Sequence, residues 1–186
     1  MRVLGVQVGL VQPLQVGDQS VMSGIVKRSV SGRVAVRALG LEGDEQADLT
    51  VHGGLSKAVY AYPVEHYEFW REARRSWGLS PELPHGSLGE NLTIEGLLED
   101  SLYVGDALLF PDCALRVTQP RMPCYKFAAT MGHAHAARKM MHGGFSGFYL
   151  AVDLPGSIEP GQGFEVEPGP RAMPLMALFR ASRARS

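Results

Sequence analysis

Cysteine is scarce in this chain, which has Cys113 and Cys124 among its 186 residues. The two cysteines fit no zinc-binding spacing and no disulfide framework. A chain of this length can bury a sizeable core without such cross-links. We therefore expect one principal domain in a reducing, cytoplasmic setting.

Long apolar runs and an excess of positive charge are also missing. Gln7, Gly9 and Gln12 interrupt the valine-rich N-terminus, and no stretch resembles a signal peptide or a membrane span. The formal net charge is −1, which does not favour a nucleic-acid polymer as partner. Four arginines fall in the last sixteen residues. We expect residues 171–186 to form a basic, solvated tail with a short helix at 173–183.

Glycine and proline are plentiful, at 22 and 12 residues, and this indicates many turns between short strands. Runs of β-branched and aromatic residues predict eight or nine strands. The predicted strands include 3–8, 22–30, 33–39, 57–62, 90–95, 102–110, 114–118, 148–153 and 163–167. Residues 12–20 are predicted to be a polar connection, and Ser31-Gly32 a hairpin turn.

The clearest helix is predicted over 63–77, with an apolar stripe at three- and four-residue spacing formed by Tyr67, Trp70, Ala73 and Trp77. One or two shorter helices are expected within 124–141, broken near Gly132 and ended by Gly143-Gly144. Residues 1–170 are therefore predicted to be one mostly β domain with a few helices, arranged as a barrel or sandwich with a packed helix.

Residues 119–126 hold the most reactive side chain, the thiol of Cys124. Pro120 and Pro123 stiffen the backbone on its N-terminal side. Arg121 and Lys126 bring two positive charges within three residues, and a nearby cation favours the nucleophilic thiolate. These features indicate a rigid loop that presents an activated sulfur. A half-buried structural cysteine in a proline-bounded turn is equally compatible with these eight residues.

Two kinds of chemistry would use such a thiolate. A nucleophilic cysteine needs a base within hydrogen-bond reach, and the sequence does not say which histidine lies near Cys124. The alternative is a single thiolate ligand to a soft or redox-active metal. The histidines available as a base are His52, His66, His85, His133, His135 and His142.

Two glycine-bearing segments could contact a ligand. In residues 51–57, Gly53 and Gly54 precede Lys57, so backbone N–H groups and an ammonium could surround an oxyanion. A glycine turn before a strand explains the same residues, and the spacing of a phosphate-binding P-loop is absent. Residues 85–91 combine small residues with Glu90 and Asn91, whose side chains could contact polar ligand atoms.

Two other polar groups have structural explanations. Glu42, Asp44 and Glu45 could bind a cation, or could form salt bridges to a neighbouring strand. His133 and His135 lie in a predicted helix, where residues two apart point in nearly opposite directions and would not share a metal ion.

Several segments occur together in an order that resembles the MOSC domain family (molybdenum cofactor sulfurase C-terminal domain), in its stand-alone bacterial YiiM-like branch of 6-N-hydroxylaminopurine resistance proteins. The resemblance covers roughly residues 20–168. It rests on Leu39-Gly40-Leu41-Glu42-Gly43-Asp44-Glu45-Gln46-Ala47-Asp48, Val51-His52-Gly53-Gly54, Tyr62-Pro63-x-Glu65-His66-Tyr67-x-x-Trp70, Leu88-Gly89-Glu90-Asn91-Leu92, Gly96-Leu97, Val104-Gly105-Asp106 and Gln119-Pro120-Arg121-x-Pro123-Cys124-x-Lys126.

The resemblance implies a MOSC-type β-barrel and a molybdenum-pterin cofactor with Cys124 as metal ligand. The anionic cofactor would need a basic, glycine-lined cleft. The residues assigned to that task are Arg121, Lys126, Lys57, His52, Gly53, Gly54, Asn91 and Gln119. The residues assigned to proton delivery are His52, His66 and Glu90.

The implied reaction is reduction of an N-hydroxylated base or related compound, in which R–NHOH, two electrons and two protons give R–NH2 and water. A separate reductase would supply the electrons, because the chain has no flavin, haem or iron–sulfur motif. A homodimer is a further partner compatible with the sequence. The alternative functions are a non-catalytic carrier of cofactor or sulfur through Cys124, and a cysteine hydrolase.

Overall fold

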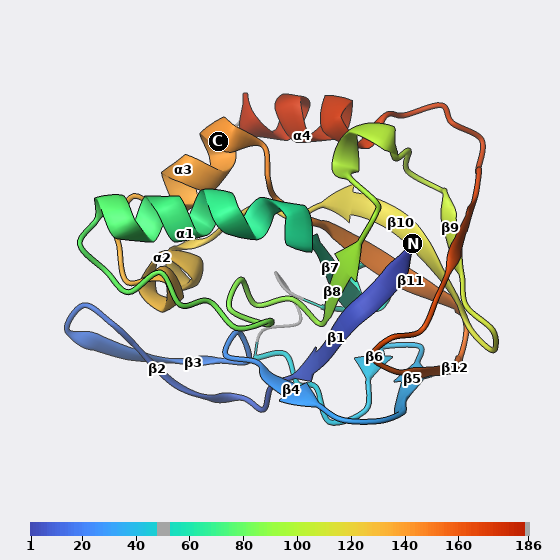
Figure 1. Cartoon of the computed structure of the whole chain (residues 1–186), viewed down its shortest axis with the longest axis horizontal. Helices are drawn as coiled ribbons and strands as arrows, with labels where there is room; N and C mark the ends of the chain where they lie inside the picture. Colours follow the sequence, from blue (N-terminus) through green and yellow to red (C-terminus); the bar gives the residue numbers. More distant parts are fainter. Residues whose placement is uncertain (48–52, 185–186) are drawn as a thin grey trace.

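The computed structural model describes residues 1–47 and 53–184. Figure 1 shows a large twisted sheet with helices packed along one side and two small sheets at its lower edge. In the described part, the large sheet has eight strands in the order β13-β9-β10-β11-β7-β8-β1-β4. Neighbouring strands are antiparallel except β7 and β8, which run parallel. The strands are β1 (Arg2–Val8), β4 (Arg28–Val30), β7 (Val59–Pro63), β8 (Leu92–Glu95), β9 (Ala107–Leu109), β10 (Ala114–Pro120), β11 (Phe148–Leu154) and β13 (Glu165–Glu167).

The small sheets lie beside the large one. One contains β5 (Val34–Arg37), β6 (Gly40–Leu41) and β12 (Gly156–Ile158), with β5 in the middle. The other is a hairpin of β2 (Gln12–Val16) and β3 (Gln19–Ser23), which extends from the lower left of the molecule in Figure 1.

Four α-helices complete the described structure, with short 3-10 turns between strands. They are α1 (Tyr67–Ser76), α2 (Tyr125–Met131), α3 (Ala136–Gly143) and α4 (Leu175–Arg183). The 3-10 turns are η1 (Leu55–Lys57), η2 (Val64–His66) and η3 (Glu99–Ser101). Gly132 and Gly144 adopt the left-handed conformation directly after α2 and α3. Glycine enters that conformation without a steric penalty, so the predicted helix ends are confirmed.

Strand β7 organises the core because all five of its residues are buried. Its side chains alternate between the two faces of the sheet. Val59 and Ala61 join the apolar cluster within the sheets, whereas Tyr60 and Tyr62 join a second cluster under the helices. The second cluster includes Trp70 of α1, and the predicted stripe of α1 is thus confirmed as its buried face.

The fold is mostly β, as predicted, but the barrel is not closed. β13 and β4 form the two ends of the sheet order in the described residues. An isolated bridge between Arg2 and Gly163 brings the chain before β13 to the start of β1. The mixed sheet therefore curves toward closure without a continuous ring of paired strands.

Two local predictions were wrong. Residues 12–20 form most of a hairpin rather than a polar connection, and β4 and β5 do not pair across Ser31-Gly32. β4 pairs with β1, and β5 pairs with β12 and β6. Partners distant in sequence decide the pairing, and a local turn signal cannot report them.

Within the described ranges, we find no helix that combines the length and the apolar character needed to span a bilayer.

Candidate functional site

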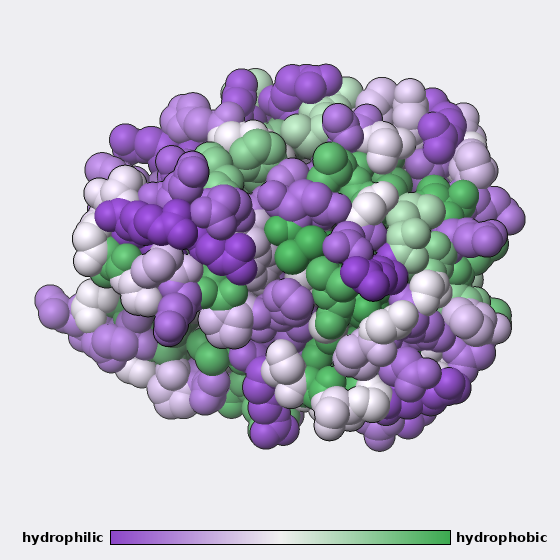
Figure 2. Space-filling view, viewed as in Figure 1, coloured by the Kyte–Doolittle hydropathy of each residue, from purple (hydrophilic) through white to green (hydrophobic). Residues whose placement is uncertain are grey.

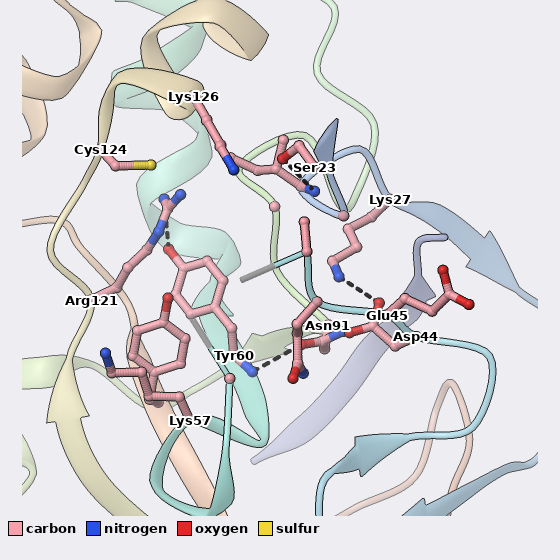
Figure 3. A pocket seen from close by; sticks show the side chains of 17 residues that line it. Ser23, Lys27, Asp44, Glu45, Lys57, Tyr60, Asn91, Arg121, Cys124 and Lys126 are labelled. Atoms are coloured by element: carbon pink, nitrogen blue, oxygen red, sulfur yellow. Dashed lines mark hydrogen bonds and ion pairs between the residues drawn. The ribbon is translucent and has the colours of Figure 1, made fainter. Parts of the chain in front are cut away.

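A cleft opens between the hairpin β2–β3, the acidic loop before residue 48 and the start of α2. Figure 3 shows that its walls come from segments far apart in the chain. The residues that line it are Ser23, Gly24, Ile25, Lys27, Asp44, Glu45, Gln46, Ala47, Gly53, Lys57, Tyr60, Gly89, Asn91, Arg121, Cys124, Lys126 and Tyr149.

Cys124 lies in this wall at the residue before α2, with extended backbone angles of φ −117° and ψ 176°. It is half-buried and not in a disulfide. In Figure 3 its sulfur points into the cleft on the same side as the guanidinium of Arg121, and Cys124 acts electrostatically on that guanidinium. Cys113 is buried elsewhere, and burial together with the charge of Asp112 raises the pKa of its thiol to about 12. The structure therefore distinguishes an accessible thiol from a buried one.

Arg121 carries the most unusual charge in the site, because the residue is only 5% exposed. Its Nη1 atom lies 3.5 Å from the hydroxyl of Tyr60 and 4.0 Å from the sulfur of Met140. Its guanidinium carbon lies 4.9 Å and 4.8 Å from the ring centres of Tyr60 and Phe127. Among the described residues, no carboxylate lies within 4.0 Å of it.

The guanidinium nevertheless stays charged. Burial acts to lower the pKa of Arg121, but Tyr60, Tyr149 and Cys124 act in the opposite direction, and the resulting pKa is above the ordinary value. Burial in turn raises the pKa values of Tyr60 and Tyr149, so both remain neutral phenols. A buried cation with neutral neighbours is a place where an anion would bind favourably.

Two lysines extend this positive region. Lys126 Nζ donates a hydrogen bond of 3.0 Å to the carbonyl oxygen of Met22, which joins α2 to the end of the hairpin. Lys57 Nζ lies 6.0 Å from the ring centre of Tyr149. Both side chains line the cleft.

The other end of the cleft is electrically balanced. Lys27 Nζ and Asp44 Oδ1 form an ion pair of 2.5 Å, with side chains 6% and 2% exposed. Asp44 also accepts the backbone N–H of Gly9, and Glu45 accepts that of Val11. The acidic loop therefore forms salt bridges and hydrogen bonds to neighbouring segments, which was one of its two predicted roles. At the end with Cys124, the buried guanidinium of Arg121 has no carboxylate within 4.0 Å among the described residues.

A metal at this site would need ligands beyond the described protein side chains. No group of three His, Cys, Asp or Glu residues close enough to hold a metal ion is found in residues 1–47 and 53–184. Cys124 offers one thiolate, a soft ligand suited to a redox-active metal.

Three of the predicted cofactor-binding residues do not present unbonded side-chain groups to the cleft. One lines the cleft with its polar atoms already hydrogen-bonded, and the other two do not line it. Asn91 lines the cleft, but its Oδ1 accepts the N–H of Tyr60 at 3.1 Å and its Nδ2 donates to the carbonyl of Gln7 at 3.2 Å. Gln119 lies on β10 opposite Tyr149 and is not among the lining residues. Gly54 precedes η1 and likewise does not line the cleft.

Gly53 does line the cleft, and its conformation requires glycine. Its φ is +87°, and a Cβ atom placed there would lie 2.0 Å from Oε1 of Gln46. The absence of a side chain at Gly53 therefore makes room for Gln46, which also lines the cleft.

Of the residues predicted to deliver protons, the two that the structure describes, His66 and Glu90, do not line the cleft. His66 is buried beside η3, where Nε2 lies 2.7 Å from Oε2 of Glu99 and the ring stacks on Phe145. His52 is outside the described residues. The role of His66 in proton delivery therefore stays a prediction that the geometry does not favour.

Glu90 is fully buried within a hydrogen-bond network. It accepts hydrogen bonds from the backbone of Gly86 at 2.8 Å and of Leu88 at 3.0 Å, and from the hydroxyls of Thr93 and Tyr67. These bonds fix the loop before β8 under α1. Its proposed catalytic role also stays a prediction.

Tyr60 and Tyr149 are site residues that sequence reasoning missed. Both occupy strands, and their rings lie 5.4 Å apart with the Tyr60 hydroxyl near Arg121. A tyrosine in a strand is usually a core residue, so only the pairing of β7 with β11 identifies these two as cleft residues.

Comparison with known proteins gives consistent matches. The model of the MOSC domain matches residues 48–165. YflK of Bacillus subtilis (strain 168) is 38% identical over 164 residues, which cover 88% of this chain and 72% of YflK. YiiM of Escherichia coli (strain K12) is 38% identical over 136 residues, covering 73% of this chain and 60% of YiiM. A protein named Reductase from Gibberella moniliformis is 31% identical over 157 residues, covering 83% of this chain and 27% of that protein.

Solved structures agree with these sequence matches. The crystal structure of YiiM from Geobacillus stearothermophilus superposes with a TM-score of 0.77 at 30% identity, covering 99% of this chain and 84% of that one. The crystal structure of YiiM from Escherichia coli gives 0.72 at 25% identity, covering 99% and 78%. The chain spans less than two thirds of the full length of the Escherichia coli protein and of the fungal protein.

Proposed function

Because this chain belongs to the MOSC domain family, we propose that its cleft binds a molybdenum-pterin cofactor and reduces N-hydroxylated bases or related N-hydroxylated compounds. The observation that carries the proposal is the pairing of the Cys124 thiol with the buried guanidinium of Arg121 in one cleft wall. The name of the fungal relative, Reductase, supports oxidoreductase chemistry in the same family.

The residues of the cleft fit such a cofactor. Cys124 supplies one soft thiolate, so the remaining ligands of a metal would come from the pterin dithiolene. Arg121 provides a buried positive charge that no carboxylate of the described structure pairs with, which suits the anionic part of the cofactor. Lys57 and Lys126 add charge for its phosphate, and Gly53 contributes its backbone to the cleft wall.

Each of these side chains has a task that follows from its position. Arg121 holds an anion against the cleft wall and favours the thiolate form of Cys124. Tyr60 positions Arg121, because its hydroxyl donates to the carbonyl oxygen of Ser146 at 2.7 Å and faces the guanidinium. The ammonium groups of Lys57 and Lys126 also line the cleft and would be proton donors there.

The cofactor, when bound, supplies the two-electron oxygen-accepting chemistry that cleavage of an N–O bond requires. The overall change is R–NHOH with two electrons and two protons to R–NH2 and water. The protein binds and orients the substrate beside Cys124 and limits the access of water. The electrons come from a separate reductase, which with the small-molecule substrate completes the proposed set of partners.

Purification from a pterin-producing host with metal analysis tests the proposal. We expect about one molybdenum per wild-type chain, loss of the metal in Cys124→Ser, and retention in Cys113→Ser as the matched control. Reduced methyl viologen as electron donor then gives turnover of an N-hydroxylamine such as 6-N-hydroxylaminopurine.

The possible results separate the candidate functions. Bound molybdenum without turnover would replace the reductase by a carrier of cofactor or sulfur that uses Cys124. A wild-type chain without molybdenum, labelled at Cys124 by a thiol-reactive acyl substrate, would contradict both and support a cysteine hydrolase.

A further inference from the structure

Two segments without acidic residues meet on one side of the molecule. Residues 113–152 and residues 168–186 contain no Asp and no Glu. The first segment contains α3 and the second contains α4. The two helices are joined where Arg183 Nη1 donates a hydrogen bond of 3.3 Å to the carbonyl oxygen of Met141, and both lie at the upper edge of Figure 1. The part of this edge that is visible over α4 is mainly hydrophilic in Figure 2.

Four cations of these helices define what we call the basic face: Arg138, Lys139, Arg180 and Arg183. The three arginines are exposed, and none of the four has a carboxylate within 4.0 Å among the described residues. Most other surface arginines do have a carboxylate oxygen within 4.0 Å. They are Arg2, Arg33, Arg37, Arg71, Arg75, Arg116 and Arg171. Among the described residues, exposed arginines without an ion pair are therefore concentrated on the basic face, and Arg28 of β4 is an exception elsewhere.

The basic face lies on the outer side of a helix whose inner side touches the cleft. Met140 of α3 is fully buried, and its sulfur lies 4.0 Å from Nη1 of Arg121. Arg138 and Lys139 precede Met140 directly. Arg138 is exposed, whereas Lys139 is partly buried, with its Nζ 4.7 Å from the ring centre of Phe69. One helix thickness, about 10 Å, thus separates the face from the group beside Cys124.

We propose that the basic face docks an acidic, flavin-bearing electron-transfer protein that reduces the Cys124 site. The inference rests on the proposed function, because reductive N–O cleavage needs electrons that this chain has no described centre to supply. For each substrate reduced, the flavin protein is oxidised by two electrons in total, and two protons from solvent complete the amine and water. Opposite charges on the two surfaces orient the encounter and raise its rate.

Two other anionic occupants fit the face less well. Without its four cations the chain has a formal charge of −1 minus 4, or −5, and that charge repels an extended polyanion such as a nucleic acid. A membrane surface also calls for exposed apolar side chains. None of the large exposed hydrophobic residues of the described structure lies in α3 or α4.

Charge reversal tests the docking. The double variant Arg138→Glu/Arg180→Glu is compared with the wild type and with Arg28→Glu, an exposed arginine of β4 that likewise has no described ion pair. The probe is an acidic flavodoxin in its reduced form, and reduced methyl viologen is the small donor. We expect the double variant to raise KM for flavodoxin about tenfold or more and to weaken its salt dependence. Turnover with methyl viologen and the melting temperature stay unchanged.

Several results would overturn the docking proposal. They are an unchanged KM for flavodoxin in the double variant, an equal effect of Arg28→Glu, or tighter binding of an oligonucleotide or a phosphatidylserine-containing vesicle than of flavodoxin through the same arginines. Failure of the proposed function is recognised separately, because it abolishes turnover with methyl viologen in every variant. Titration of the protein with oxidised flavodoxin then still tests docking, and equal binding by wild type and double variant contradicts it.

Discussion

The Nη1 atom of Arg121 lies 3.5 Å from the hydroxyl oxygen of Tyr60, beneath the cleft wall that carries Cys124. A guanidinium in this position contacts neutral groups where a protein would ordinarily place a carboxylate. The arrangement costs folding free energy and prepares the site for an anion. Stability and anion binding should therefore change in opposite directions when the charge is removed.

Replacing Arg121 by methionine tests this relationship. We expect the ligand-free variant to be as stable as the wild type or more stable by about 1–3 kcal/mol, because a buried charge without a counter-ion is removed. Urea unfolding measures the free energy. Saturating inorganic phosphate should raise the melting temperature of the wild type and leave that of the variant unchanged.

Arg116→Met is the matched control for this substitution. Arg116 is 48% exposed in its side chain and pairs with Asp153 at the surface. We expect its replacement to change stability by less than about 1 kcal/mol and to preserve the response to phosphate. A large loss of stability in Arg121→Met would instead assign the guanidinium to the core.

The two cysteines should differ in their reactivity. Burial raises the pKa of Cys113 from 9.0 to about 12, which reduces its thiolate about a thousandfold. We expect iodoacetamide at neutral pH to label Cys124 in the native protein and to leave Cys113 unmodified, as peptide mass spectrometry can show. Equal labelling before unfolding would contradict the assignment, and labelling of both in urea verifies that each can react.

The local parts of the fold were predictable because they depend on residues near in sequence. The apolar spacing of Trp70 and Ala73 identifies the buried side of α1, and Gly132 and Gly144 mark helix ends through their left-handed conformation. The proline-stiffened approach to Cys124 is equally local. Consequently the thiol and its cationic neighbours could be recognised before the fold was known.

The remainder of the site depends on contacts between distant segments. Arg121 and Tyr60 are separated by 61 residues, and Lys126 reaches Met22 across 104. The positions of Glu90 and His66 also depend on contacts between distant segments, which the sequence does not reveal. Both occur in segments typical of the family, but long-range packing places them in buried networks with Tyr67 and Glu99. A motif identifies that a residue matters without showing whether it contacts a ligand.

A substitution of His66 distinguishes these two roles. His66→Gln removes the contact to Glu99 at 2.7 Å and the stacking on Phe145. We expect a loss of about 1–3 kcal/mol in stability, because Glu99 then remains buried with a poorer partner. Metal content per folded chain should not change. Reduced turnover with unchanged urea unfolding would restore the predicted role of His66 in proton delivery.

Stability should fall at alkaline pH through the buried tyrosines. Burial is the main cause that raises the pKa values of Tyr60, Tyr62, Tyr67 and Tyr149 above 10.0. A phenol whose pKa is higher in the folded state than in the unfolded chain contributes its full stability below pH 10. This contribution is lost as the pH rises from the unfolded pKa toward the folded one.

We therefore expect most phenolate absorbance at 295 nm to appear together with the loss of circular dichroism, in one cooperative transition above pH 10. The chain unfolded in guanidinium provides the reference, since its tyrosines ionise near pH 10. Gradual ionisation of all six tyrosines while the dichroism remains native would contradict the raised pKa values.

The ion pair between Lys27 and Asp44 should be the strongest electrostatic contact in the cleft wall. It joins the segment after β3 to the acidic loop at 2.5 Å, with both side chains almost fully buried. Asp44→Asn leaves the ammonium of Lys27 without its counter-ion, and we expect a cost of about 3–5 kcal/mol in urea unfolding. Lys27→Met/Asp44→Asn removes both charges and should recover most of that loss. A double-mutant cycle gives the coupling energy, and a value near zero would show that water, rather than the partner side chain, stabilises each charge.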